Sequence, residues 1–223
     1  MKINKKLTFI SLFSGSGGFK IGFEEAGFQC LLSSDMGKTS ELTHNKNFKN
    51  NPFLLKDVRT IKTNEVLKLT KNVKPDVIIG GPPCQGFSVM GDKNSSDPRN
   101  ELFKSYVSLI KDLHPKCFVF ENVKGLSTMY RGQFLEELIN DFAACGYDIH
   151  FKIINAFDYG VPQLRERVFL VGTNQDKNFD FPKADGKKFG KLKSYVNVRQ
   201  AIFDLINESR DFPNHISLNH SET

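Results

Sequence analysis

The stretch LTFISLFSGSGGFKIGFEEAGFQCLLSSD, from Leu7 to Asp35, joins two apolar runs through a glycine-rich turn and a helix-like segment. The apolar runs are Leu7 to Phe13 and Gln29 to Asp35, whose β-branched, aromatic and leucine side chains are typical of strands. Phe19 to Ala26 has helical character, and Gly27 follows it as a stop signal. This order predicts two strands of one sheet that are connected by a helix.

The same alternation continues along the chain. We expect further strands and further helices as follows: strands at Phe53 to Asp57, Asp76 to Gly81, Cys117 to Asn122, Tyr147 to Ala156 and Arg167 to Thr173, and helices at Thr39 to Asn47, Thr60 to Lys71, Glu101 to Leu113 and Gln133 to Cys145. About ten residues separate the last two strands, too few for a crossover helix, which favours an antiparallel return. The sequence therefore predicts a doubly wound, mostly parallel, Rossmann-like α/β sheet of about seven strands, with one reversed strand.

Composition gives the setting of this fold. The 223 residues are 39% hydrophobic and include 21 Phe, which is enough apolar material for one well-buried core. The apolar run near the N-terminus is too short for a signal peptide or a membrane span, so we expect a cytoplasmic protein without a membrane partner. The four cysteines are widely spaced and form no CxxC pair, so neither a metal site nor a disulfide framework is indicated.

Positive charge is concentrated in the first third of the chain. The formal net charge is +6, and residues 1 to 75 carry 13 Lys and Arg against 6 Asp and Glu. A further basic run, PKADGKKFGKLK, extends from Pro182 to Lys193. Such a run is either a solvated loop or a segment that contacts phosphate, and the charge alone does not distinguish the two.

Acidic residues follow two of the predicted strands at the edge where such sheets bind ligands. Asp35 comes about 20 residues after the first glycine of the turn, where a carboxylate can accept hydrogen bonds from a ribose, and Asp57 could accept from an adenine amino group. Lys20 occupies the place of the last glycine in a dinucleotide fingerprint. Either acid alone is better explained as a helix N-cap. Together with the glycine turn they indicate a cofactor that contains adenosine.

The segment GGPPCQGFS, from Gly80 to Ser88, mounts a cysteine on a rigid turn. Proline fixes its own backbone and restricts the residue before it, so Cys84 is directed toward the cofactor side of the sheet. A thiolate at this position is a candidate nucleophile. Glu121 ends another apolar strand, where shielding from water would raise its pKa and suit it to act as an acid. We interpret Cys30, Cys117 and Cys145 as small buried hydrophobic residues.

The blocks FSGSGGF, GGPPCQGFS, FENV and YGVPQLRERVFLVG, in this order, resemble the DNA cytosine-5 methyltransferase family. The resemblance extends from about Leu7 to Gly172, and VNVRQAIFDL and PNHISLNHSE resemble the segments that usually follow. It implies methyl transfer from S-adenosylmethionine to C5 of cytosine in double-stranded DNA, in a restriction-modification enzyme of bacterial type. A transfer RNA methyltransferase or a noncatalytic binding module with the same fold are the alternatives.

The resemblance also assigns roles to residues. Cys84 would add to C6 of the cytosine while Glu121 hydrogen-bonds its N3, and Asn122 would support Glu121 and the turn around Cys84. The residues of a QxRxR block would hold the flipped nucleotide and its phosphate, unless they are surface ion pairs: Gln163, Arg165 and Arg167. Gln85 and Ser88 would contact the substrate, and the loop Gly91 to Asn100 would close over the DNA. The implied cofactor site consists of Phe13, Ser14, Gly15, Ser16, Gly17, Gly18, Asp35, Met36, Asp57, Val58, Pro83 and Leu102.

Two departures from the family pattern concern the cofactor contact and the end of the chain. Ser11 stands where the family often has Asp, and Asp35 stands where it often has Glu. The chain ends at Thr223, before the family's target-recognition region and last two signature blocks. We therefore expect a cofactor-binding and catalytic domain at residues 1–175 and a connecting segment at 176–223. The chain would be one subunit of a split enzyme with a complementing chain, or a shortened form of a longer protein, and would have little sequence-specific activity alone.

Overall fold

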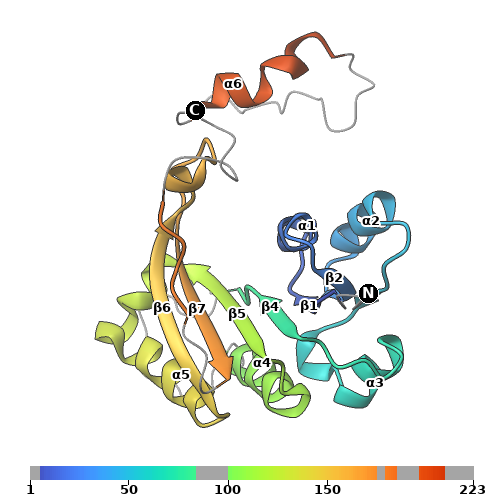
Figure 1. Cartoon of the computed structure of the whole chain (residues 1–223), viewed down its shortest axis with the longest axis vertical. Helices are drawn as coiled ribbons and strands as arrows, with labels where there is room; N and C mark the ends of the chain where they lie inside the picture. Colours follow the sequence, from blue (N-terminus) through green and yellow to red (C-terminus); the bar gives the residue numbers. More distant parts are fainter. Residues whose placement is uncertain (1–5, 84–99, 175–178, 185–195, 209–223) are drawn as a thin grey trace, which may run out of the picture. The chain divides into compact units, whose positions relative to one another are not determined.

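Seven strands form one sheet in the order β3-β2-β1-β4-β5-β7-β6 in the computed structural model (Figure 1). The strands are β1 Thr8–Leu12, β2 Gln29–Asp35, β3 Phe53–Leu55, β4 Val77–Gly80, β5 Cys117–Val123, β6 Tyr147–Asn155 and β7 Glu166–Asn174. The pairs β1 with β2, β1 with β4, β2 with β3 and β4 with β5 are parallel, and β7 is antiparallel to β5. The predicted mostly parallel sheet with a reversed strand is confirmed.

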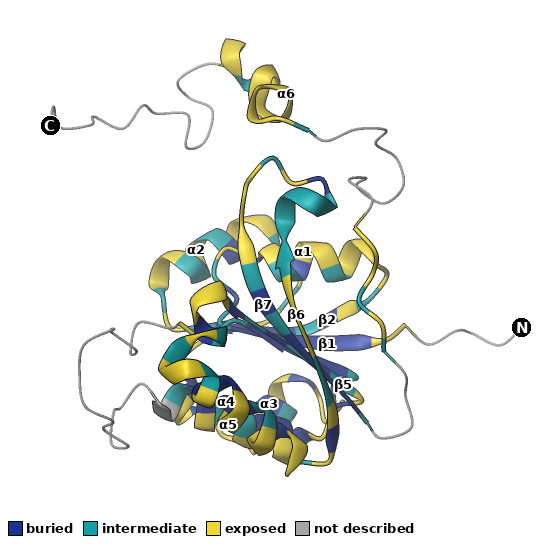
Figure 2. Cartoon of the chain, turned by 90° about the vertical axis from the view of Figure 1, so that its left-hand side faces the viewer, coloured by how far each residue is buried: buried dark blue, intermediate teal, exposed yellow. Residues whose placement is uncertain are grey.

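Helices cover both faces of this sheet. The helices that follow β1 and β2 are α1 Gly18–Glu25 and α2 Lys38–Asn47, and they lie on one face; α3 Thr63–Leu69, α4 Asn100–Leu113 and α5 Gln133–Ala143 lie on the other (Figure 2). Strands that run parallel need such crossover connections. Their carboxyl ends therefore lie at one edge, where the loops that follow β1, β2, β4 and β5 gather.

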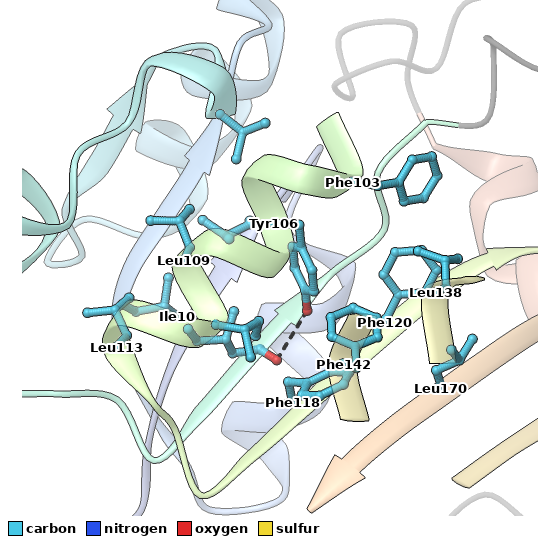
Figure 3. Packing of buried hydrophobic residues seen from close by; sticks show 14 of the residues in the cluster. Ile10, Phe103, Tyr106, Leu109, Leu113, Phe118, Phe120, Leu138, Phe142 and Leu170 are labelled. Atoms are coloured by element: carbon cyan, nitrogen blue, oxygen red, sulfur yellow. Dashed lines mark hydrogen bonds between the residues drawn. The ribbon is translucent and has the colours of Figure 1, made fainter. Parts of the chain in front are cut away.

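The larger hydrophobic core lies beneath α3, α4 and α5. It contains a cluster of aromatic side chains, and four of them are fully buried: Tyr106, Phe118, Phe120 and Phe142 (Figure 3). The Tyr106 hydroxyl donates to the carbonyl of Val119 at 3.0 Å, so this polar group is satisfied inside the core. On the opposite face, a smaller cluster of Phe9, Cys30, Val77 and Ile79 packs against the α1 side chains Phe19 and Phe23.

One predicted helix begins later than its sequence indicates. The segment expected to be helical from Thr60 to Lys71 starts with a 3₁₀ turn, η1, at Val58–Thr60, and α3 begins only at Thr63. The Asp57 side chain accepts from the Arg59 N–H and so caps the short 3₁₀ turn, which comes before the α-helix. Lys71 and Asn72 adopt left-handed φ values of 55° and 62°, and end the helical segment.

The structure describes residues 6–83, 100–174, 179–184 and 196–208. Contacts within the chain divide it into two units: Met1–Ile153 with Arg167–Phe181, and Ile154–Glu166 with Pro182–Thr223. The second unit contains the short 3₁₀ turn η4 Ala156–Tyr159, the helix α6 Val198–Ile202 and the 3₁₀ turn η5 Phe203–Asn207. No helix within the described residues is long and apolar enough to cross a membrane.

Candidate active site

A cavity of about 260 Å³ opens at the carboxyl edge of β1, β2 and β4. Seven of the twelve predicted cofactor residues line it: Phe13, Asp35, Met36, Asp57, Val58, Pro83 and Leu102. Leu12, Ser34, Lys56 and Gly81 complete the wall and were not predicted. The wall is mainly apolar with a few carboxylates and one ammonium, which is the usual composition of a small-molecule site.

Asp35 is held at the mouth of this cavity by two backbone donors. Its Oδ2 accepts from the N–H of Gly15 at 2.9 Å, and its Oδ1 accepts from the N–H of Gly37 at 2.8 Å. Each carboxylate oxygen has a second lone pair, so two further donors can be accepted. Phe13, at the end of β1, has a left-handed φ of 53° and lies beside this group in the cavity wall. A strained residue of this kind is most common at functional sites.

The glycine turn itself lies next to the cavity rather than in its wall. Ser14 is buried; its N–H donates to the Ser34 carbonyl at 3.0 Å, while its hydroxyl has no partner within the described part of the chain. Ser16 and Gly18 are exposed, and Gly17 is buried in a left-handed conformation. A buried hydroxyl without a partner is costly, and a polar ligand group at the turn would satisfy it.

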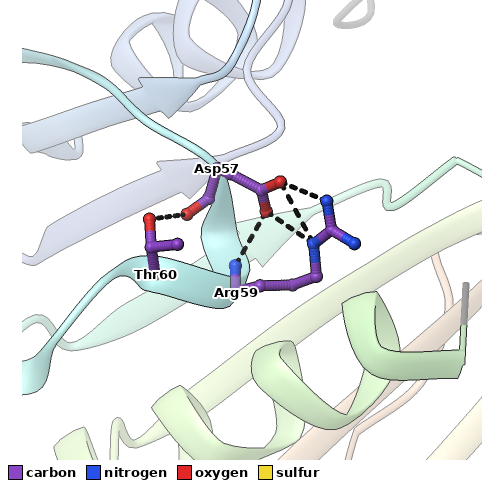
Figure 4. A network of polar contacts seen from close by, with 3 residues as sticks. All are labelled: Asp57, Arg59 and Thr60. Carbon is purple, nitrogen blue, oxygen red and sulfur yellow. Dashed lines mark hydrogen bonds and ion pairs between the residues drawn. The ribbon is translucent and has the colours of Figure 1, made fainter. Parts of the chain in front are cut away.

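Asp57 is paired with a residue that the sequence did not single out. Its carboxylate accepts from the backbone N–H of Arg59 at 3.0 Å and from the guanidinium, with Nε 3.1 Å from both carboxylate oxygens (Figure 4). Hydrogen bonding from the Arg59 side chain lowers the pKa of Asp57 despite its partial burial. Asp57 is therefore ionised at neutral pH, and a ligand amino group would share it with Arg59.

The two glycines before the proline pair allow close packing under the site. A Cβ atom on Gly80 would lie 2.7 Å from Cε2 of Tyr106, and one on Gly81 would lie 2.7 Å from Oε2 of Glu121. Real Cβ atoms essentially never approach other atoms so closely. The absence of side chains at these positions brings the Glu121 carboxylate against the turn that leads to Cys84.

Glu121 and Asn122 connect the end of β5 to this turn and to β7. The Glu121 Oε1 lies 3.0 Å from Nε of Arg167, and both side chains are partly buried. An arginine partner favours the ionised carboxylate, which is opposite in direction to the effect of shielding expected from the sequence. The buried Asn122 side chain donates to the Pro82 carbonyl at 2.9 Å and accepts from the N–H of Val123.

Other predicted substrate residues lie elsewhere or outside the described residues. Gln163 and Arg165 belong to the second unit, in the loop between β6 and β7. There the Asn155 side chain accepts from the N–H of Arg165 at 3.0 Å and fixes the return of the chain. Cys84, Gln85 and Ser88 lie outside the described residues, as does the predicted lid from Gly91 up to the start of α4.

The three described cysteines are thiols with little tendency to ionise. Burial raises the pKa of Cys30 and Cys145, and it raises the pKa of Cys117 to about 11. None of them is a reactive thiolate at neutral pH. Among the described residues, no three His, Cys, Asp or Glu side chains gather in an arrangement that could hold a metal ion.

Comparison with known proteins identifies the family. The family model for C-5 cytosine-specific DNA methylases matches residues 7–223. The chain belongs to this family. The cavity, Glu121 and the GGPP turn all lie at the carboxyl edge of the sheet in this family member.

Methylase relatives are matched over different shares of their length. Type II methyltransferase M.FnuDI of Fusobacterium nucleatum is 40% identical over 203 residues, which cover 89% of this chain and 56% of the relative. Type II methyltransferase M.AquIA of Picosynechococcus is 38% identical over 225 residues, covering 91% of this chain and 90% of the relative. A crystal structure from E. coli, of a prophage-encoded protein described as a DNA modification methyltransferase, superposes with a TM-score of 0.74 at 31% identity and covers 89% of this chain and 55% of that one.

The chain thus spans little more than half the length of M.FnuDI and of the E. coli structure. The methylase match includes all of the described residues except Lys6.

Proposed function

We propose that the chain transfers a methyl group from S-adenosylmethionine to C5 of cytosine in double-stranded DNA. The observation that carries the proposal is the position of Glu121, whose carboxylate packs against Gly81 in the turn that leads to Cys84 and borders the cavity. An acid packed against the turn that leads to a cysteine in the sequence, and an adenosine-sized cavity at the same sheet edge, fit a covalent transfer to a cytosine ring. Membership of the methylase family supports the same reaction.

The cavity fits the nucleoside part of the cofactor. Its volume of about 260 Å³ is slightly below the roughly 300–1,000 Å³ of whole ligand sites, so the amino-acid part would extend over the adjoining glycine turn. Asp35 would accept from the ribose hydroxyls, Asp57 from the adenine amino group, and Phe13 would cover the adenine ring. The Ser14 hydroxyl, at the glycine turn, would hydrogen-bond a polar group of the amino-acid part of the cofactor. When bound, the cofactor supplies an electrophilic methyl group.

The chain's own residues would activate the cytosine. The Cys84 sulfur, as the thiolate, forms a bond to C6 while Glu121 donates a hydrogen bond to N3, so that the electron pair displaced from the C5–C6 bond is stabilised in the ring. C5 would then take the methyl group as the bond between that methyl and the sulfonium sulfur of the donor breaks, with the electron pair of that bond staying on the sulfur. Loss of the C5 proton to a base restores the C5–C6 double bond, breaks the C6–S bond and regenerates the Cys84 thiolate.

Arg167 would link nucleotide binding to the protonation of Glu121. In the structure its guanidinium pairs with the Glu121 carboxylate and favours the ionised form. We infer that a phosphate of the flipped nucleotide draws Arg167 away, because a forked guanidinium also suits phosphate. Without that cation beside it, Glu121 gains affinity for the proton that it needs to hydrogen-bond N3.

Reading of the DNA sequence would require residues beyond the catalytic part. We propose that residues 1–175 bind the cofactor and perform the chemistry, and that 176–223 connect them to a recognition region. The partial coverage of M.FnuDI supports such a region in that relative, whereas M.AquIA is matched over 90% of its length.

A covalent trap tests the reaction. DNA that contains 5-fluorocytosine cannot lose a proton at C5, so a methylated adduct through Cys84 should accumulate with the cofactor present. The chain, mixed with a complementing recognition chain, should form an adduct that survives denaturation, and Cys84→Ser should form none. A parallel arm with fluorinated transfer RNA tests the alternative substrate. An equal adduct with Cys84→Ser, or capture of RNA but not DNA, would overturn the proposed reaction.

A further inference from the structure

A buried lysine lies directly behind the glycine turn. Lys20, in the first turn of α1, is only 1% exposed, and lysine is almost never so buried unless it is paired. Its Nζ lies 2.5 Å from Oε1 of Glu24, one turn later, and 4.2 Å from the centroid of the Phe48 ring. The ammonium is therefore held between a carboxylate and the face of an aromatic ring.

The same ring presses on the turn. Phe48 ends α2, and a Cβ atom on Gly17 would lie 2.7 Å from its Cε2, so only glycine leaves room for the ring. On its other side, Phe48 contacts the ring of His44 at a centroid distance of 5.0 Å, and His44 contacts Phe53 at 4.8 Å. The ring is thus supported from the sheet side by two further rings and cannot retreat from Gly17 without disturbing them.

Gly17 in turn determines the shape of the glycine turn. Its N–H donates to the Ser14 carbonyl at 2.9 Å, and it caps α1 in a left-handed conformation with φ 94°. The next contact along the turn is the Gly15 N–H with the Asp35 carboxylate, which lines the cavity. The packing of Phe48 against Gly17 therefore affects the conformation of the turn and the position of Asp35, the acid proposed to bind ribose.

We propose that Lys20 and Phe48 are positioning residues, which hold the glycine turn in the conformation that binds the cofactor. This inference rests on the proposed function, because the turn matters only if the cofactor lies over it. A cation attracts the face of the ring and so fixes the ring's orientation as well as its place. An apolar side chain at position 20 would fill the same space without that attraction, and the ring could tilt away from Gly17.

Four variants of the whole chain separate positioning from stability. Phe48→Leu removes the ring, Lys20→Met removes the charge at nearly the same shape, and Lys20→Arg keeps a cation for rescue. Phe23→Leu is the matched control: Phe23 also lies on α1, but its ring packs on Phe9 and Phe28 at 5.2 Å and takes no part in the contact with Gly17. Calorimetric titration with S-adenosylmethionine gives the dissociation constant, and thermal unfolding gives the stability of each variant.

We expect Phe48→Leu and Lys20→Met to raise the dissociation constant at least about tenfold, and Lys20→Arg to restore it to within about threefold of the wild type. Phe23→Leu should lower Tm about as much as Phe48→Leu but leave the dissociation constant within about twofold. Hydrogen exchange at the amides of Gly15, Gly17 and Gly18, measured without cofactor, should accelerate in Phe48→Leu and Lys20→Met only.

Two other outcomes are distinct. If affinity followed Tm in all four variants, or the turn amides exchanged as in the wild type, Lys20 and Phe48 would be structural residues only and this inference would be wrong. If the wild-type chain bound no S-adenosylmethionine at millimolar concentration, the proposed function would fail instead. The exchange measurement would still decide whether Lys20 and Phe48 hold the turn.

Discussion

Replacing Gly80 with alanine tests how tightly the GGPP turn is built onto the core. The new Cβ would lie 2.7 Å from Cε2 of Tyr106, 3.1 Å from the Leu12 carbonyl oxygen and 3.4 Å from the Leu12 Cβ. Tyr106 has no room to move, because it is fully buried and its hydroxyl donates to the Val119 carbonyl at 3.0 Å. The backbone of Leu12 belongs to the central strand β1 and is equally constrained.

The size of the effect follows from two destabilising contributions and one stabilising contribution. Overpacking of a core costs about 1–3 kcal/mol, and weakening of the Tyr106 hydrogen bond adds up to about 1 kcal/mol. Loss of glycine entropy in the unfolded chain offsets about 0.4–1 kcal/mol. We therefore expect a net loss of about 1–3 kcal/mol, which in a domain of this size lowers Tm by roughly 3–10 °C.

Thermal unfolding followed by circular dichroism measures this loss, with Gly22→Ala as the control. Gly22 lies in α1, and a Cβ there would meet no atom within 4 Å, so this variant should gain up to about 1 kcal/mol of stability. The double variant Gly80→Ala with Tyr106→Leu should be more stable than the sum of the single effects predicts. A Gly80→Ala protein as stable as the wild type would refute the packing argument.

Three further predictions concern charged groups. Burial lowers the pKa of His44 below its ordinary value of 6.5, so the folded state favours the neutral imidazole. The stability that this contributes is present above about pH 6.5 and is lost as the pH falls below that value. Tm should therefore fall between pH 7 and 5, and should fall less in His44→Phe. Arg59→Met should cost no more than about 1 kcal/mol because the pair is partly exposed, yet raise the pKa of Asp57 in a carbon-13 NMR titration; an unchanged pKa would exclude Arg59 as its cause. Arg167→Met should destabilise the chain more than Arg59→Met in urea unfolding, because the Arg167 side chain is the more buried of the two arginines, at 23% exposure against 40%; the reverse order would contradict the geometry of that pair.

The strands and helices could be predicted because their patterns are local. Apolar runs such as Val77–Gly80 and glycine stops such as Gly27 and Gly146, both left-handed in the structure, depend on neighbouring residues only. The start of α3 could not be predicted in the same way. Whether Asp57 caps a short turn or leads straight into a helix depends on its contact with Arg59, which periodicity does not reveal.

Candidate site residues divide along the same line. Asp35 and Asp57 were predicted because carboxylates at strand ends are visible in the sequence, and the structure brings both to one cavity. In the sequence, Lys20 was notable only because it occupies the place of the last glycine of a dinucleotide fingerprint, and no motif included Phe48. The role proposed for them depends on the contact between α1 and the end of α2, which the sequence does not reveal. The Arg167 contact with Glu121 depends on the register of β7 against β5, in which Val123 faces Arg167, and no spacing in the sequence states that register.

Binding of S-adenosylmethionine to the chain tests the central claim most directly. Calorimetric titration of the wild type should give saturable binding of one molecule, with no heat from NAD at the same concentration. Asp35→Asn keeps the shape of the side chain but removes the charge that accepts from ribose, and we expect it to weaken binding at least about tenfold, or about 1.4 kcal/mol. Absence of saturable binding by the wild type, or equal binding by Asp35→Asn, would contradict the assignment of this cavity as the cofactor site.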